Sequence, residues 1–458
     1  MRKIKLGIVL TARDTFPPRD MAAENAVRIR VRLENIFEKM PFVECVWAEH
    51  LLEDGMVTGI EESGKVADFL REQKVDALFV PHANFGQEEA VGIIANALRV
   101  PTLVWGPRDG RPDEVTVIRD RNLTDTQCGL FATTRLLMRY GVPYTYLRNC
   151  WLDSEELENG ILQFIRVASV VKQFRNLRIL QLSTRPRQFL SVKVNEGELL
   201  ERFGIHIVPI ESTEIVSEIN SYIKEKSRAE ELLQKWEEEK VLIKGMGEED
   251  KLSMASIVLA IRHMAEKYRC SAVASECWAL LRSHFKVSGC FAFGYLSQLG
   301  IPVTCETDIH GAISSILAQA AALYETPSFL ADITVRHPQN DNAELLWHCG
   351  PFPYELAKDK ACVNAGKGQY ELKEGKLTLV RFDTDHNDYY LLAEECETTS
   401  GPATDGNYVW IQTQDWGKWE DKLMYGPYIH HIAGVYGSYK EVFHEACKYM
   451  GVIHDSVY

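Results

Sequence analysis

Several kinds of segment are missing from this sequence, and their absence narrows the class of protein. No apolar run approaches the roughly 18 residues needed to span a bilayer. The apolar stretch near the N-terminus, residues 6–10 (LGIVL), is too short for the core of a signal peptide. The 11 cysteines contain no CxxC pair, so neither a zinc ribbon nor a thiol redox motif is indicated. We therefore expect reduced thiols in a cytoplasmic protein that does not act at a membrane.

The common nucleotide and hydrolase motifs are also missing. The sequence contains no GxGxxG, GxxxxGK[ST], GxSxG or HExxH, each of which would place a particular chemistry on a strand or helix. Its net charge is −14, without a basic stripe. Nucleic acid and anionic lipid are consequently poor candidates as partners.

What the sequence does contain is a strand–helix alternation. The runs KIKLGIVL (3–10), VDALFVPH (75–82) and PTLVWG (101–106) predict buried strands, and helical periodicity follows each of them. This order favours a parallel sheet with helices on both faces. We predict a Rossmann-like, doubly wound α/β domain over residues 1–173.

The same pattern begins again further along the chain. LRILQLST (177–184) and SAVAS (271–275) predict strands of a second doubly wound α/β domain over residues 174–330. From about residue 330, strand-like pieces with turn residues replace helical periodicity. The predicted architecture is thus two α/β domains followed by a β-rich, barrel-like C-terminal domain over residues 331–458.

The segment CETDIHG (305–311) holds three polar side chains in front of a predicted helix. The carboxyl ends of strands in α/β sheets are where ligands bind, and the strand IPVTC delivers Glu306 to that edge. Asp308 is better placed to cap the free N–H groups of the helix that follows. We expect a functional role for Glu306 and a capping role for Asp308.

Two later segments each place one polar side chain in an apolar run. Asp332 interrupts SFLADITVRH, where it is either a hydrogen-bonded group or a metal ligand, because an unpaired buried charge is costly. His348 in LLWHCGPFP is either a structural histidine or a functional one. Local sequence does not decide between these alternatives.

Two adjacent histidines, His430 and His431, occur in the strand-like segment YGPYIHHIAGVYG. Successive strand residues point to opposite faces, so at most one is expected to point directly into a given site. The other would contact substrate if the strand is bent there. Two acids with one or more histidines suit a hard divalent cation such as Mn²⁺ or Mg²⁺ better than they suit a thiolate-bound zinc.

These segments resemble the L-fucose/L-arabinose isomerase superfamily, in particular its fucose-isomerase-like branch, over most of the chain. CETD resembles the stretch with the first metal-binding glutamate, SFLADITV the stretch with the second acid, and YIHHIAG the region that ends with the metal-binding histidine. The resemblance implies that Glu306, Asp332 and His431 hold Mn²⁺, or another divalent cation such as Mg²⁺ or Co²⁺. It implies substrate contacts for His430 and His348, and in the arabinose branch the latter position also binds metal.

The resemblance further implies sugar contacts elsewhere in the chain. Arg13 in LTARD, with Asn84 and Phe85 in PHANFGQEE, follow predicted strands. In the family, such N-terminal groups complete the site of a neighbouring subunit, which implies a homo-oligomer, either a trimer or a hexamer. Glu276 and Trp278 in SECWALL fall where the family presents polar contacts to substrate; the alternatives are a solvated strand end and a core tryptophan.

The activity implied is an aldose–ketose isomerisation of a monosaccharide through an enediol. Glu306 and Asp332 are then the candidates for the general acid–base pair that moves a proton between C2 and C1. One of them must stay partly free of the metal to act as base, and the sequence does not decide which.

The segment STRPRQF (183–189) suggests the substrate. Arg185 and Arg187 follow a predicted strand, and arginine suits bidentate binding of an oxyanion. They lie either in a surface loop or in a site for an anionic sugar such as sulfoquinovose, and Arg108 could join them. The alternatives are an isomerase of neutral sugars such as L-fucose or L-arabinose, an epimerase or dehydratase, and a non-catalytic sugar-binding protein.

Overall fold

The computed structural model describes residues 3–15, 19–109 and 123–458. It divides the chain into two compact units, Met1–Lys172 and Gln173–Tyr458, each with its own apolar core. Within the described ranges, no helix is both long and apolar enough to cross a membrane.

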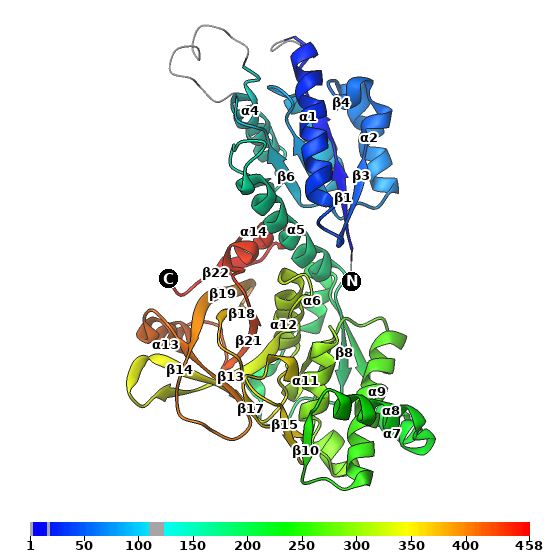
Figure 1. Ribbon diagram of the computed structural model, residues 1–458, viewed down its shortest axis with the longest axis vertical. Helices are drawn as coiled ribbons and strands as arrows, with labels where there is room; N and C mark the ends of the chain where they lie inside the picture. The colour runs from blue at the N-terminus through cyan, green and yellow to red at the C-terminus, as the bar shows by residue number, and fades with distance from the viewer. Residues whose placement is uncertain (1–2, 16–18, 110–122) are drawn as a thin grey trace. The chain divides into compact units, whose positions relative to one another are not determined.

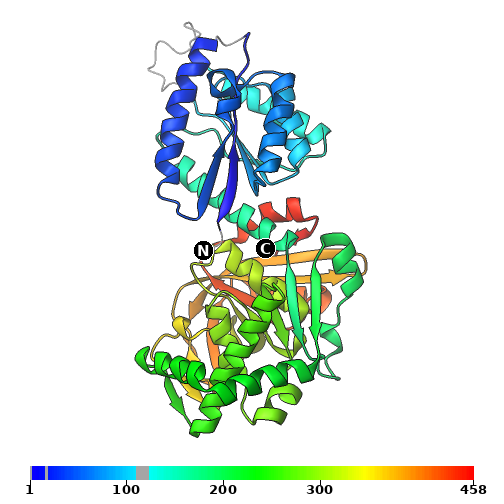
Figure 2. The ribbon, with the colours of Figure 1, turned by 90° about the vertical axis from the view of Figure 1, so that its right-hand side faces the viewer.

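The first unit is built on a five-stranded parallel sheet of order β3-β1-β5-β6-β7. Numbered by position in the chain, these strands follow the order 2-1-3-4-5, a doubly wound arrangement that reverses direction between β1 and β5. Helices cover both faces of the sheet (Figures 1 and 2). The strands are β1 (Ile4–Ile8), β3 (Val43–Trp47), β5 (Ala77–Pro81), β6 (Thr102–Trp105) and β7 (Thr145–Tyr146), and the helices are α1 (Arg19–Phe37), α2 (Ile60–Glu72), α3 (Glu88–Leu98), α4 (Thr126–Arg139) and α5 (Glu155–Arg175).

The second unit contains a four-stranded parallel sheet of order β12-β11-β8-β9. Its order repeats the start of the first sheet, with the reversal between β8 and β11. The elements are β8 (Arg178–Leu182), β9 (His206–Ile210), β11 (Ala272–Ser275) and β12 (Val303–Thr304), with α6 (Glu196–Phe203), α7 (Ser212–Glu225), α8 (Ser227–Glu238), α9 (Glu248–Lys267), α11 (Cys290–Gln298) and α12 (Ile309–Ala321).

The rest of the second unit is β-rich and barrel-like, as predicted. Six antiparallel strands pair in the order β20-β14-β13-β21-β18-β19, and β19 pairs again with β20, which closes the ring. The strands are β13 (Phe329–His337), β14 (Asn340–His348), β18 (Lys376–Asp385), β19 (Asp388–Thr399), β20 (Asn407–Gln412) and β21 (His431–Tyr436), with α13 (Trp416–Tyr425) and α14 (Lys440–Met450) after the last two. The predicted division at residue 330 remains a prediction, because both parts belong to one compact unit.

Helix α12 joins the two parts of the second unit. All 13 of its residues are buried, because it packs against β11 and β12 on one side and β18 and β21 on the other. A helix that is buried all round is expected to be largely apolar, and IHGAISSILAQAA is so. Two of its buried polar side chains, Ser314 and Gln319, donate to backbone carbonyls. It starts at Asp308, whose Oδ1 accepts from the backbone N–H of Gly311 at 2.9 Å, which confirms the predicted cap.

The barrel contains one buried acid that lacks a compensating partner. Glu344 in β14 is 4% exposed, and its Oε2 has no hydrogen-bond partner among the described residues. Burial raises the pKa of Glu344 to about 7, although the charge of Arg336 on β13 opposes the shift. The folded chain therefore holds a proton that the unfolded chain has released between the ordinary value of 4.5 and about 7.

Stability is consequently expected to fall as pH rises through that window, because the unfolded state binds fewer protons there. Glu344→Gln should raise the free energy of unfolding by on the order of 2 kcal/mol at about pH 8 and change it little at about pH 4. Urea unfolding at the two pH values measures this. Glu397→Gln, an exposed glutamate in β19, is the matched control; an equal effect at both pH values would contradict the assignment.

Candidate metal centre

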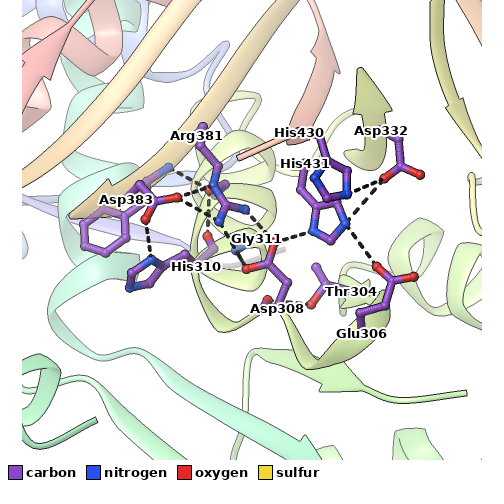
Figure 3. Close-up of polar contacts among 12 residues, drawn as sticks. Thr304, Glu306, Asp308, His310, Gly311, Asp332, Arg381, Asp383, His430 and His431 are labelled. Atoms are coloured by element: carbon purple, nitrogen blue, oxygen red, sulfur yellow. Dashed lines mark hydrogen bonds and ion pairs between the residues drawn. The ribbon is translucent and has the colours of Figure 1, made fainter. Parts of the chain in front are cut away.

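Three segments bring an acid or a histidine together beyond the end of β12. Glu306 follows that strand, Asp332 lies in β13 and His431 begins β21. Strands β13 and β21 pair antiparallel with Asp332 directly opposite His431. The Nε2 atom of His431 lies 3.0 Å from Glu306 Oε2 and 3.4 Å from Asp332 Oδ1 (Figure 3). The residues predicted to hold a metal are thus neighbours in the structure.

Glu306 reaches this position through an unusual turn. Strand β12 ends at Thr304, and both Glu306 (φ 57°) and Thr307 (φ 56°) adopt the left-handed conformation. Residues with a Cβ rarely occupy that region, and such strain concentrates at functional sites. The turn is held by the Thr304 hydroxyl, which donates to the carbonyl of Asp308 at 2.9 Å.

A buried chain of charges orients the ring of His431. Its Nδ1 donates to Asp308 Oδ2 at 2.8 Å, and Arg381 of β18 pairs with both oxygens of that carboxylate. Arg381 also bonds Asp383 at 2.9 Å, which in turn contacts His310 at 3.0 Å. A histidine held in this way through one nitrogen presents the other in a fixed direction, as in metal sites supported by a second layer of carboxylates.

The donor atoms of this cluster fit a divalent cation. Glu306 Oε2, Asp332 Oδ1 and His431 Nε2 are buried, and within the described part of the chain they approach one another at ion-pair distances. Asp332, His430 and His431 offer one ligand atom each, and these atoms lie within 4.8 Å of one another. Two carboxylates that converge on one buried imidazole nitrogen require positive charge between them, and carboxylate oxygens with imidazole nitrogen suit Mn²⁺ or Mg²⁺. The cluster can therefore hold a metal ion.

The charges of the cluster favour the same conclusion. Burial lowers the pKa of His431, but its hydrogen bond to Asp308 and its contact with Glu306 raise that pKa by more, to about 10. Burial raises the pKa of Glu306, but the hydrogen bond to His431 and the charges of His348 and His431 together lower it to below its usual value. Binding of a cation to Nε2 accordingly displaces a proton from the ring.

A cavity of about 260 Å³ opens onto this cluster. Of the predicted substrate contacts, it includes His348, His430 and Trp278, together with the acids Glu306 and Asp332. The backbone N–H of Cys349 donates to His348 Nδ1 at 2.8 Å, so Nε2 of this ring carries a proton, which finds no acceptor among the residues that the structure describes. The other residues that line the cavity are Phe189, Cys277, Arg282, Ser288, Cys290, Trp347, Cys349 and Lys367.

Arg185 and Arg187 lie elsewhere in the second unit. They line a different cavity of about 460 Å³, which Lys193 and Thr307 also border and to which neither Glu306 nor Asp332 contributes. Arg185 Nη1 lies 3.2–3.3 Å from three backbone carbonyls of its own loop. The structure therefore does not bring these two arginines into the cavity of the metal cluster.

Glu276 does not line the cavity of the metal cluster and has a structural role. It is buried, and its two carboxylate oxygens accept from the backbone N–H groups of Trp278 (2.6 Å), Ala279 (2.8 Å) and Leu280 (3.1 Å). It thereby starts the π-helical turn Trp278–Arg282. Trp278 itself is 41% exposed, so it is not a core tryptophan.

The predicted sugar contacts of the first unit meet at the reversal point of its sheet. Asn84, which follows β5, accepts from the backbone N–H of Arg13 at 2.8 Å and donates to its carbonyl at 2.9 Å. The guanidinium of Arg13 stacks over the ring of Phe85, 3.8 Å from its centroid. The edge of the sheet beside such a reversal is the usual binding crevice of doubly wound folds.

Comparisons with known proteins place the chain near a group of sugar isomerases. Residues 7–175 match the family model described as "Fucose/sulfoquinovose isomerase, N-terminal domain". A protein of Priestia aryabhattai named sulfoquinovose isomerase is 25% identical over 84% of this chain and 86% of its own length. A protein of Alkalicoccus urumqiensis with the same name is 24% identical over 71% of this chain and 73% of its own.

Among solved structures, a periplasmic solute-binding protein of Actinobacillus succinogenes with bound D-allose is 12% identical, covering 70% of this chain and 89% of its own. Its TM-score is 0.18, which is too low to support an argument about fold or function.

Proposed function

Because residues 7–175 belong to the fucose/sulfoquinovose isomerase N-terminal domain family, we propose that the protein is a divalent-metal-dependent aldose–ketose isomerase. The observation that supports this most directly is the convergence of Glu306, Asp332 and His431 beside one cavity, where both carboxylates approach the same imidazole nitrogen. A sugar-binding protein without catalysis has no need of two acids and a buried, charge-supported histidine.

In the proposed mechanism Glu306, Asp332 and His431 hold the cation, with Mn²⁺ as the first choice. When bound, a divalent cation polarises the sugar oxygens on C1 and C2. A carboxylate, either Glu306 or Asp332, takes the proton from C2 and returns it to C1 of the enediol. The Nε2–H of His348 has no acceptor among the described residues, so it donates to a sugar oxygen. The half-exposed ring of His430 lines the same cavity, 3.9 Å from Asp332.

We further propose an anionic monosaccharide as substrate, with sulfoquinovose first, because the two relatives described above carry that name. The chain is also proposed to form a homo-oligomer, a trimer or hexamer, in which the Arg13–Asn84–Phe85 cluster contributes to a neighbouring subunit's site.

The test is a substrate panel in D₂O followed by NMR. Sulfoquinovose, L-fucose and L-arabinose are each incubated with protein as purified, after EDTA, and after addition of Mn²⁺, Mg²⁺ or Co²⁺. We expect a ketose with deuterium on C1, EDTA-sensitive and restored by metal, since a carboxylate that carries the proton exchanges it with solvent. Binding without any product would support a binding protein instead, and an epimer or a dehydrated product would support one of the other enzyme classes.

A further inference from the structure

The cavity of the metal cluster is lined by two cationic side chains, one exposed and one half-buried. Arg282 and Lys367 both line it. Neither side chain forms a hydrogen bond or an ion pair with any residue that the structure describes. We propose that Arg282 and Lys367 bind an anionic group carried by the sugar, at the end remote from the carbons that isomerise. This inference rests on the proposed function and names the residues that select its substrate.

The backbone fixes both cations at the cavity wall. Arg282 ends the π-helical turn that Glu276 starts, and its N–H bonds the carbonyl of Cys277 at 3.1 Å. Lys367 begins β16 (Lys367–Gly368), directly after Gly366 (φ +78°). A Cβ on Gly366 would lie 2.5 Å from the carbonyl oxygen of Ser288, so only glycine permits the close approach that brings Lys367 beside the start of α11.

The balance of charge in the cavity favours an anion. Its ionisable lining residues other than histidine and cysteine are Glu306, Asp332, Arg282 and Lys367, two negative and two positive. Once the two carboxylates share a divalent cation, the balance becomes positive by two. A neutral sugar would leave the positive charges of the exposed Arg282 and the half-buried Lys367 uncompensated, whereas an anionic sugar pairs with them. A guanidinium beside an ammonium suits a sulfonate, phosphate or carboxylate.

The other arginine pair lacks these features. Arg185 and Arg187 line a cavity to which neither Glu306 nor Asp332 contributes, and Arg185 already bonds three carbonyls of its own loop. A sugar whose C1 and C2 lie at the metal cluster shares its cavity with Arg282 and Lys367. We therefore assign the preference for an anionic sugar to Arg282 and Lys367.

The experiment compares sulfoquinovose with quinovose, which lacks the sulfonate, by calorimetric titration with and without Mn²⁺ and by kcat/KM. Glucose phosphate and glucuronate distinguish the kinds of anion. The variants are Arg282→Gln, Lys367→Gln and the charge-retaining Arg282→Lys. The matched control is Lys286→Gln, an exposed cation four residues later that does not line the cavity. Circular dichroism verifies that each variant folds.

Loss of a charge-assisted hydrogen bond should weaken binding and kcat/KM for the sulfonated sugar about 10- to 100-fold more than for quinovose. Arg282→Lys should retain part of the preference, and Lys286→Gln all of it. The inference is overturned if the wild type does not prefer any anionic sugar. It is also overturned if Arg282→Gln and Lys367→Gln lower kcat/KM equally for both sugars, or if Arg185→Gln and Arg187→Gln cause the selective loss. Preferential binding that depends on Arg282 without any turnover would sustain this inference and contradict the proposed isomerase.

Discussion

Glu306→Gln is expected to lower kcat for the sugar by about 10³-fold while the fold remains intact. The amide keeps the shape of the side chain but removes the negative charge that faces His431 Nε2 at 3.0 Å. It can neither accept a proton at neutral pH nor bind a hard cation as strongly as a carboxylate does. Initial rates at saturating Mn²⁺, metal content after dialysis and thermal unfolding together measure the effect.

The controls distinguish the loss of a carboxylate in the site from the loss of a carboxylate elsewhere. Asp332→Asn should behave like Glu306→Gln, because its Oδ1 also faces His431 Nε2, at 3.4 Å. Glu374→Gln removes a carboxylate whose side chain is 79% exposed and should leave the rate unchanged. Near-normal isomerisation by either the Glu306 or the Asp332 variant would exclude that acid from the reaction.

The sequence predicts where a strand ends better than it predicts the direction of the side chains that follow the strand. The apolar run IPVTC predicted that Glu306 would be carried to the edge of a sheet. In the structure, β12 is only Val303–Thr304, and a left-handed turn completes the path to the site. Two successive non-glycine residues in that conformation have no local signal, because the contacts that stabilise them are made by the fold as a whole.

The adjacent histidines show a similar limit. Alternation predicts opposite faces, and the two side chains do differ in exposure, 50% for His430 and 1% for His431. Strand β21 begins only at His431, so the side chain of His430 does not follow the alternation of the strand. Its Nε2 therefore still comes within 3.9 Å of Asp332. A bend at the first residue of a strand is a tertiary feature that periodicity does not encode.

The charged support of His431 was not predicted. Asp308 was expected to cap α12 and does so, but its second oxygen holds His431. Arg381 reaches Asp308 across 73 residues of sequence, through the register of β18 against β21. A signal was present, since Arg381 and Asp383 interrupt the apolar run KLTLVRFD as Asp332 interrupts its own. Buried charges in a strand require partners, but sequence alone does not say which partners they have.

Arg381→Met is expected to lower the free energy of unfolding of the second unit by about 3 kcal/mol or more. Arg381 is 1% exposed and neutralises Asp308 and Asp383, which are themselves buried. Burial lowers the pKa of Arg381, but these two carboxylates raise it by more. The substitution leaves two buried acids with only His431 and His310 as partners, and the cost of losing the guanidinium outweighs the apolar contacts that methionine adds. Urea unfolding at neutral pH measures the loss.

Two further variants identify the cause. Arg336→Met breaks an exposed ion pair with Glu420, with side chains 42% and 50% exposed, and should cost less than about 1 kcal/mol. The triple variant Arg381→Met, Asp308→Asn, Asp383→Asn removes all three charges and should recover much of the stability. It should not recover metal affinity, because an amide no longer fixes the ring of His431 as a carboxylate does. If stability and metal affinity returned together, Asp308 would be only a helix cap; if stability alone returned, the charge of Asp308 would be retained for the metal centre and not for the fold.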